Sequence, residues 1–166
     1  MIRANKKMVD ELDGIGPEDR MLPVQLLDLL RQGFCEHGGC YFLRGLFERS
    51  TNVTIDNFID KTGYECFINS IHIDDYVSHG YIAHACDFVT LLFDKWIEFS
   101  VGIPLQSIMS SDEFGVNIKF HLLRDGESFV AEDVEKYDDP IIVWDSRSTI
   151  NQKRGKVHFL PCDEMR

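Results

Sequence analysis

The sequence predicts an α+β fold in which N-terminal helices and a long central helix pack on a mainly antiparallel sheet. Helical patterns dominate the first two-thirds of the chain, and strand patterns dominate the last third. A hydrophobic content of 44% in 166 residues is enough to build one core. Because no repeat, low-complexity tract or linker interrupts the sequence, we expect a single domain over residues 1–166.

The N-terminal part is expected to contain two helices. Residues 3–13 predict a short helix that ends at the turn Gly14-Ile15-Gly16-Pro17. Pro23 can open a second helix, VQLLDLLRQ, which Gly33 ends. The following text, GGCYFLRGLFERS, fits a strand and a helix equally well, so it stays open.

The middle of the chain predicts a strand followed by the longest helix. Residues 65–73, ECFINSIHI, are rich in β-formers and predict a largely buried strand. From His79 to Ser100 apolar residues recur at helical spacing, beside a narrower polar stripe. The apolar positions are Ile82, Ala85, Cys86, Val89, Leu92, Phe93, Trp96 and Ile97, and the polar ones are His84, Asp87, Asp94 and Glu98.

The C-terminal part is expected to supply the sheet, after a loop or short helix that follows Pro104. Residues 116–122 alternate apolar and polar side chains, as in a half-buried strand. Asp125-Gly126 predicts a tight turn, so residues 127–134 should return as the antiparallel partner. Residues 141–144 and 156–160 predict two further strands, separated by the turn-prone segment SRSTINQKRG.

The charge of the chain restricts its partners. Arg and Lys total 17 against 28 Asp and Glu, a net charge of -11, which opposes binding to nucleic acid or anionic lipid and favours a cationic partner. Five scattered cysteines are typical of reduced thiols. The first residues lack the apolar run of a secretory signal. We therefore expect a cytoplasmic protein that binds neither nucleic acid nor membrane.

Residues 72–87, HIDDYVSHGYIAHACD, have the composition of a metal or acid–base site, but their spacing does not support one. His79 and His84 are five residues apart, which on a helix separates them by about 140°. The sequence has no nucleophile elbow, Walker loop or dinucleotide fingerprint, and no cysteine has clustered Lys or Arg beside it. We expect no catalytic residue, metal or cofactor.

The clearest functional signal is the acidic run EDVEKYDD at residues 132–139. Such a run can be a solvated surface that keeps the protein soluble, or a docking surface for a basic protein. Opposed charges accelerate association, as an inhibitor of a nuclease requires. Phe129, Tyr137 and Trp144 lie near this run, and aromatic residues are common both in interfaces and in cores. We expect Trp144, within the apolar run IIVW, to be buried.

Residues 64–89, YECFINSIHIDDYVSHGYIAHACDFV, resemble the central part of immunity proteins from bacterial contact-dependent growth inhibition systems, in the ribonuclease-toxin immunity group. The resemblance covers about a quarter of the chain. It implies a cytosolic, non-enzymatic protein that binds the C-terminal toxin domain of a surface-delivered effector and blocks its nuclease site. The residues that carry the likeness are Gly63, Ile71, Ile73, Asp75, Tyr76, Tyr81, Cys86 and Phe88.

The leading hypothesis is thus an immunity protein whose carboxylates contact the toxin. Charge alone selects the candidate contacts, which are Asp74, Asp75, Asp87, Asp94, Glu98, Glu132, Asp133, Glu135, Tyr137, Asp138 and Asp139. The alternative is a small metal-dependent or histidine-based hydrolase. Its site would lie near His72, Asp74, Asp75, His79 and His84, or for a ribonuclease among His37, His72 and His121. An intracellular adaptor for another cation-rich protein is a third alternative.

Overall fold

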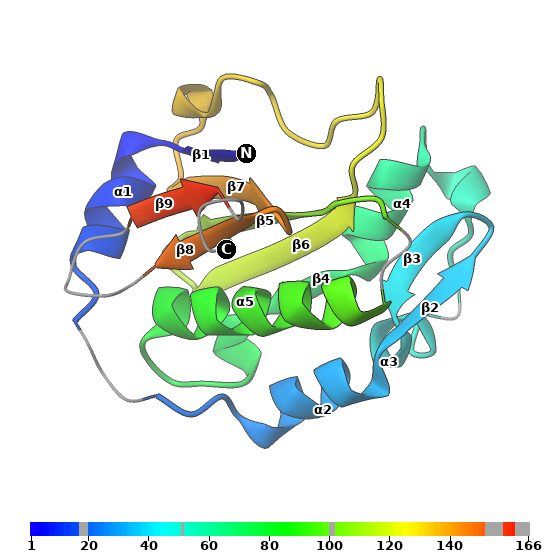
Figure 1. The fold of residues 1–166 in the computed structure, drawn as a ribbon, viewed down its shortest axis with the longest axis horizontal. Helices are drawn as coiled ribbons and strands as arrows, with labels where there is room; N and C mark the ends of the chain where they lie inside the picture. Colours follow the sequence, from blue (N-terminus) through cyan, green and yellow to red (C-terminus); the bar gives the residue numbers. More distant parts are fainter. Residues whose placement is uncertain (17–19, 51, 100–101, 152–157, 162–166) are drawn as a thin grey trace.

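An antiparallel sheet with a long helix across one face forms the centre of the molecule (Figure 1). The computed structural model describes residues 1–16, 20–50, 52–99, 102–151 and 158–161. In this part of the chain the main sheet has five strands in the order β1-β7-β5-β6-β4. Their bounds are Ile2–Ala4 (β1), Ser70–His72 (β4), Leu105–Ser111 (β5), Val116–Leu122 (β6) and Ile141–Asp145 (β7). The fold is therefore α+β, as predicted.

The remaining elements surround this sheet. Two small hairpins pair β2 with β3 and β8 with β9. The hairpin strands are Phe34–His37 (β2), Cys40–Leu43 (β3), Ser148–Asn151 (β8) and His158–Pro161 (β9). The α-helices are Lys6–Asp13 (α1), Val24–Gln32 (α2), Arg44–Phe47 (α3), Lys61–Ile68 (α4) and Tyr81–Phe99 (α5), and the 3-10 turns are Ile55–Asn57 (η1), Ile73–Asp75 (η2) and Val134–Lys136 (η3).

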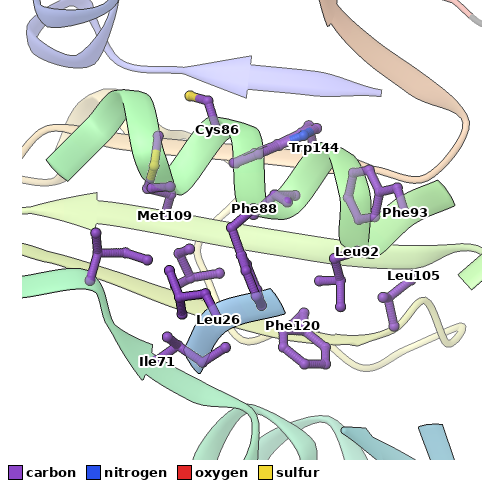
Figure 2. Close-up of a cluster of buried hydrophobic side chains, with 14 of the residues drawn as sticks. Leu26, Ile71, Cys86, Phe88, Leu92, Phe93, Leu105, Met109, Phe120 and Trp144 are labelled. Carbon is purple, nitrogen blue, oxygen red and sulfur yellow. The ribbon is translucent and has the colours of Figure 1, made fainter. Parts of the chain in front are cut away.

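The main core lies between α5 and the sheet, with α1 and α2 completing it (Figure 2). Phe88 and Leu92 of α5 are fully buried together with Phe120 of β6 and Met109 of β5. Trp144 of β7 is buried as well, as its apolar run predicted. Burial of each large side chain of this kind stabilises the fold by about 1.5–3 kcal/mol, so this layer is the main source of stability.

The opposite face of the sheet is covered more thinly. Cys66 of α4 and Val130, from the long connection between β6 and β7, pack there against Ile108 and Val143. The connection has one short 3-10 turn, η3, and no strand. This face is therefore covered partly by α4 and partly by a loop.

Several predicted elements are confirmed. The helix VQLLDLLRQ is α2 and ends at Gly33, whose φ of 69° favours glycine. The long helix is α5, although its Ile97 is exposed instead of buried and its His84 is buried instead of exposed. The strands predicted at 116–122 and 141–144 are β6 and β7.

The helix predicted at residues 3–13 begins later than expected. Ile2–Ala4 instead pairs with β7 as the edge strand β1. Asn5 then caps α1, because its side chain accepts a hydrogen bond from the Met8 backbone NH at 3.0 Å. Burial of Asn5 against the sheet, where it also bonds the Ile141 backbone NH, fixes this boundary.

The strand predicted at residues 65–73 is wrong for most of its length. Residues 61–68 form α4, and only Ser70–His72 is a strand. Asp60 starts the helix by accepting a hydrogen bond from the Gly63 backbone NH at 2.7 Å. The β-forming residues are overridden because Cys66 and Ile68 pack on different clusters, on two faces of one helix.

Three expectations about the last third are also corrected. The loop or short helix expected after Pro104 is the central strand β5, in which Ser107 is fully buried. The predicted return strand at residues 127–134 is absent, because β5 and β4 already occupy both edges of β6. The Asp125-Gly126 turn does form, with Gly126 at a φ of 80°. The segment expected to be only a turn contains β8. The strand predicted at 156–160 overlaps β9 at residues 158–160, and its first two residues lie outside the described residues.

A buried ion pair joins α4, β6 and the β2–β3 hairpin. The Glu65 carboxylate has no exposed surface and lies 2.7 Å from the Arg124 guanidinium. It also accepts hydrogen bonds from the backbone NH groups of Tyr41, at 2.7 Å, and Leu122, at 2.8 Å. Arg124 additionally donates to the Gly39 carbonyl at 3.0 Å. The carboxylate thus satisfies donors from β3, from β6 and from the loop after β6 at once.

Replacement of Glu65 by Ala should destabilise the protein by about 3–5 kcal/mol, because Arg124 and two backbone NH groups lose their buried acceptor. Urea denaturation followed by circular dichroism measures the change. The control is Glu98→Ala, which removes an exposed pair with Lys95 and should cost less than about 1 kcal/mol. Equal losses in the two variants would show that Glu65 has no special structural role.

Candidate functional site

Residues 131–139, in the connection between β6 and β7, form a negatively charged surface that we call the acidic loop. Four predicted contact residues, Glu132, Asp133, Asp138 and Asp139, are exposed within it. Glu135 is exposed as well, and its carboxylate accepts a hydrogen bond from the Lys6 backbone NH at 3.0 Å. The loop therefore presents most of its carboxylates to solvent.

The backbone of the acidic loop is fixed from below by polar side chains of β1 and α1. Arg3 donates hydrogen bonds to the carbonyls of Ala131, at 3.2 Å, and Glu132, at 2.6 Å. The buried Asn5 donates to the Asp139 carbonyl at 2.8 Å, and Lys7 donates to the Asp138 carbonyl. These three side chains bind carbonyl oxygens on the inner side, so the loop is held in place while its carboxylates stay outside.

Few of these carboxylates are paired within the protein. Asp133 lies 3.9 Å from Lys136, a distance typical of a weak exposed pair. Within the described ranges, no ion pair is formed by the carboxylates of Glu132, Asp138 or Asp139. An ordered loop with unpaired carboxylates can bind cationic groups at a small entropic cost.

Tyr137 has a structural contact within the acidic loop. Its hydroxyl accepts a hydrogen bond from the Ala131 backbone NH at 2.9 Å, across the base of the loop. Its ring is half-buried and packs on the cluster around Ile108 and Val143. The other aromatic near the run, Phe129, is 43% exposed, and the Lys119 ammonium lies 5.9 Å from its ring centroid.

The remaining predicted contacts are not gathered with the acidic loop. Asp87, Asp94 and Glu98 follow one stripe of α5, which covers the face of the sheet opposite the loop (Figure 1). Asp74 and Asp75 lie in η2, where the Asp74 side chain fills the space beside Gly115. The eleven residues therefore occupy three separate surfaces, and the acidic loop holds the largest group.

The acidic residues of α5 are also partly neutralised. Asp87 lies 3.6 Å from the largely buried Arg20 guanidinium, and Glu98 lies 2.6 Å from the Lys95 ammonium. Asp94 is exposed. These contacts leave the α5 stripe with less net charge than its sequence indicates.

The histidines of the hydrolase alternative do not converge. His72 lies on β4 and its Nε2 atom is 3.0 Å from Asn117 Nδ2, whereas His79 is exposed before α5. His84 is buried, and burial together with the Arg20 charge lowers its pKa. Over the described ranges, no three side chains of His, Cys, Asp or Glu are arranged to hold a metal ion.

Most cysteines in the described part of the chain are buried. Cys40, Cys66 and Cys86 are buried, and Cys35 is half-buried. Burial raises the pKa of Cys40 to about 11, and it raises the pKa of Cys66 further. Thiols with a raised pKa are poor nucleophiles. Cys162 lies outside the described residues.

A cavity of about 350 Å³ lies where the end of α1 meets the start of α5. It is lined by residues of the turn after α1, by Gly80 to Ala83, and by Ser111 of β5. The Arg20 side chain also lines it, but its guanidinium faces the Asp87 carboxylate. Part of the stretch HIDDYVSHGYIAHACD lines this cavity, but none of the three histidines of the stretch does.

A second hollow, of about 220 Å³, lies beside the acidic loop on the thinly covered face of the sheet. We call it the sheet groove. Its floor comes from β5, β6 and β7, and its wall comes from the connection that includes the acidic loop. Its lining residues are Ile108, Ser110, Asn117, Lys119, Phe129, Val130, Tyr137, Asp139 and Ile141.

Most of the sheet groove could not be read from the sequence. Ile108 and Ser110 belong to β5, which carried no clear strand signal, and they meet Lys119 and Asn117 only through the strand register. One signal of the groove was available in the sequence. Polar residues of β6 alternate with buried ones, which predicts that β6 has a second face outside the main core.

In the part of the chain that the structure describes, none of the helices has the length and apolar character that a bilayer crossing requires.

Comparison with known proteins identifies the family of this chain. Residues 3–154 match the family model described as "Uncharacterized protein PM0498 family". A relative from Pasteurella multocida (strain Pm70), "Uncharacterized protein PM0498", is 32% identical over 142 residues, which cover 77% of this chain and 87% of the relative. No solved structure matches the chain. The chain belongs to the PM0498 family.

The buried His121 should make stability depend on pH. Burial lowers its pKa below the ordinary value near 6.5, and its Nδ1 atom lies 2.7 Å from the Leu122 carbonyl. The unfolded chain therefore binds a proton more readily than the folded chain. Stability from this residue should be complete above about pH 6.5 and should decline as the pH falls towards its folded pKa.

Urea denaturation at pH 7.5 and at pH 5.5 tests this expectation, with His121→Gln and His79→Gln compared. Substitution of the buried histidine should flatten the change in unfolding free energy between the two pH values. Substitution of the exposed His79 should leave the change as in the unmodified protein. If His121→Gln keeps the full pH dependence, the decline comes from other groups.

Proposed function

We propose that this protein is an immunity protein that binds and neutralises a basic nuclease toxin domain, with the acidic loop as its principal contact. The observation that carries the proposal is the loop itself, in which exposed carboxylates stand on a backbone held by Arg3, Asn5 and Lys7. The net charge of -11 supports a cationic partner. The resemblance of residues 64–89 to immunity proteins of contact-dependent growth inhibition supports the same class.

The proposed inhibition is electrostatic and steric. A ribonuclease holds the phosphates of its substrate with Lys and Arg side chains, which are complementary to the carboxylates of the loop. Opposed charges can raise association rates to roughly 10⁸ M⁻¹ s⁻¹ or more, so that the inhibitor captures the toxin before RNA does. Binding would then cover the substrate path. The protein needs no catalytic residue, metal or cofactor of its own for this role, and it would act in the cytoplasm.

The most direct test is co-purification with the C-terminal toxin domain of the effector encoded immediately upstream. We expect a stable one-to-one complex, loss of RNA cleavage by the toxin domain, and rescue of cells that express it. A toxin domain that neither binds nor is inhibited would contradict the proposal. So would hydrolysis of a substrate by the purified protein alone.

Charge removal in the acidic loop should slow association with the toxin domain. The triple variant Glu132→Gln, Asp133→Asn, Asp138→Asn keeps the side-chain shapes and is expected to reduce the association rate by about tenfold at low salt. Stopped-flow fluorescence at two salt concentrations measures the rate. The control pair, Asp94→Asn with Glu98→Gln on α5, should change it by less than about twofold. Equal effects of both variants would mean that total charge, and not the loop, directs binding.

A further inference from the structure

The sheet groove contains an arrangement of groups that suits one particular kind of side chain. We propose that it receives an arginine side chain of the basic partner, with the guanidinium bound to Asp139. This inference rests on the proposed function, since it names the group through which the partner would be anchored.

The size of the groove favours a side chain over a cofactor. Its volume of about 220 Å³ is below the roughly 300–1,000 Å³ of pockets that hold drug-sized ligands. Ile108 and Ile141 of its floor and the half-buried Tyr137 ring of its wall are apolar, which suits the methylene stem of a long side chain.

The polar groups of the groove are mostly acceptors. Asp139 is exposed, and its backbone is held at the groove by the hydrogen bond from Asn5 to its carbonyl. Asn117 directs its Nδ2 atom towards Ser70 and His72 on β4, at 3.0 Å each, which leaves Oδ1 as its acceptor. Ser110 lies between Asn117 and Ile141 in the strand register and adds a hydroxyl.

This set of acceptors favours arginine over lysine. A guanidinium has five donors in a planar fork, so it can bind a carboxylate and neighbouring oxygens at the same time, whereas an ammonium is a point charge that is more strongly hydrated. The aromatic wall adds a surface on which a guanidinium can stack. Arginine is also enriched among the residues that dominate binding energy in interfaces.

Lys119 gives the groove a direction. Its ammonium lies 5.9 Å from the ring centroid of Phe129, which also lines the groove. Lys119 is paired with Ile108 in the register of β5 and β6. A second cation is repelled from that position and attracted to the Asp139 carboxylate. The groove therefore has one cationic and one anionic lining residue, and the arginine head group belongs with the anionic one.

The test uses two probes that separate this inference from the proposed function. The first probe is a blocked Gly-Arg-Gly peptide, compared with blocked Gly-Lys-Gly, titrated into the isotope-labelled full chain and followed by NMR. The arginine peptide should shift the Asn117 side-chain amide and the Ser110 and Ile141 backbone signals at lower concentration than the lysine peptide. No shift at these positions would overturn the inference, whatever the toxin domain does.

The second probe is the toxin domain, with charge-matched variants. Asp139→Asn should raise the Kd at least about tenfold more than Asp138→Asn, because both remove one exposed carboxylate but only Asp139 lines the groove. The larger increase in Kd for Asp139→Asn should come from a faster dissociation rate. Lys119→Gln should lower the Kd about threefold, because it removes the repelling charge.

The outcomes of the two probes are distinct. Equal effects of Asp139→Asn and Asp138→Asn on a complex that does form would overturn the groove as the anchor and leave the proposed function standing. A toxin domain that does not bind, together with arginine-selective shifts in the groove, would contradict the proposed function and keep the arginine site for another basic protein.

Discussion

The fold depends on one carboxylate in a place that carboxylates rarely occupy. Glu65 is fully buried, yet it accepts hydrogen bonds from two backbone NH groups and from Arg124. A buried charge is tolerated only when its oxygens are satisfied, so the β2–β3 hairpin and the end of β6 must both reach their positions for α4 to pack. This requirement links the helical N-terminal part of the chain to the sheet. It also fixes the point from which the connection to β7 starts.

Regular periodicity made the elements of the main core predictable. The long helix and the strand β6 present apolar side chains at the spacing of their structure. Strand β7 is instead a short continuous apolar run that is buried on both faces of the sheet. Where packing is less regular, the sequence failed. The segment of α4 is rich in β-formers, and its helical state is determined by Glu65 and Cys66, whose contacts lie 24 or more residues away. The Asp125-Gly126 turn predicted a hairpin because the sequence does not reveal that both edges of β6 are already paired.

The candidate site was likewise predictable only in part. Its acidic residues could be found from composition, because consecutive carboxylates in a loop are exposed in almost any fold. Their distribution over the surface could not be predicted. Asp87 and Asp139 lie on different surfaces because their elements cover opposite sides of the sheet. The sheet groove was also hidden, because residues from 108 to 141 meet there through three strands and one connection. The charge of a segment follows from its local sequence, whereas the shape of a groove depends on pairing between residues far apart in the chain.

The two outer strands of the sheet have a consequence for behaviour at high concentration. In the described part of the chain, β1 and β4 form its margins, and each has three residues. Unpaired backbone groups at such margins are a common template for amyloid-like polymerisation, and very short strands are one way in which natural proteins suppress it. Neither margin gives a neighbouring molecule a long ladder to extend. The short margins accordingly disfavour edge-to-edge polymerisation of this sheet when the protein is abundant.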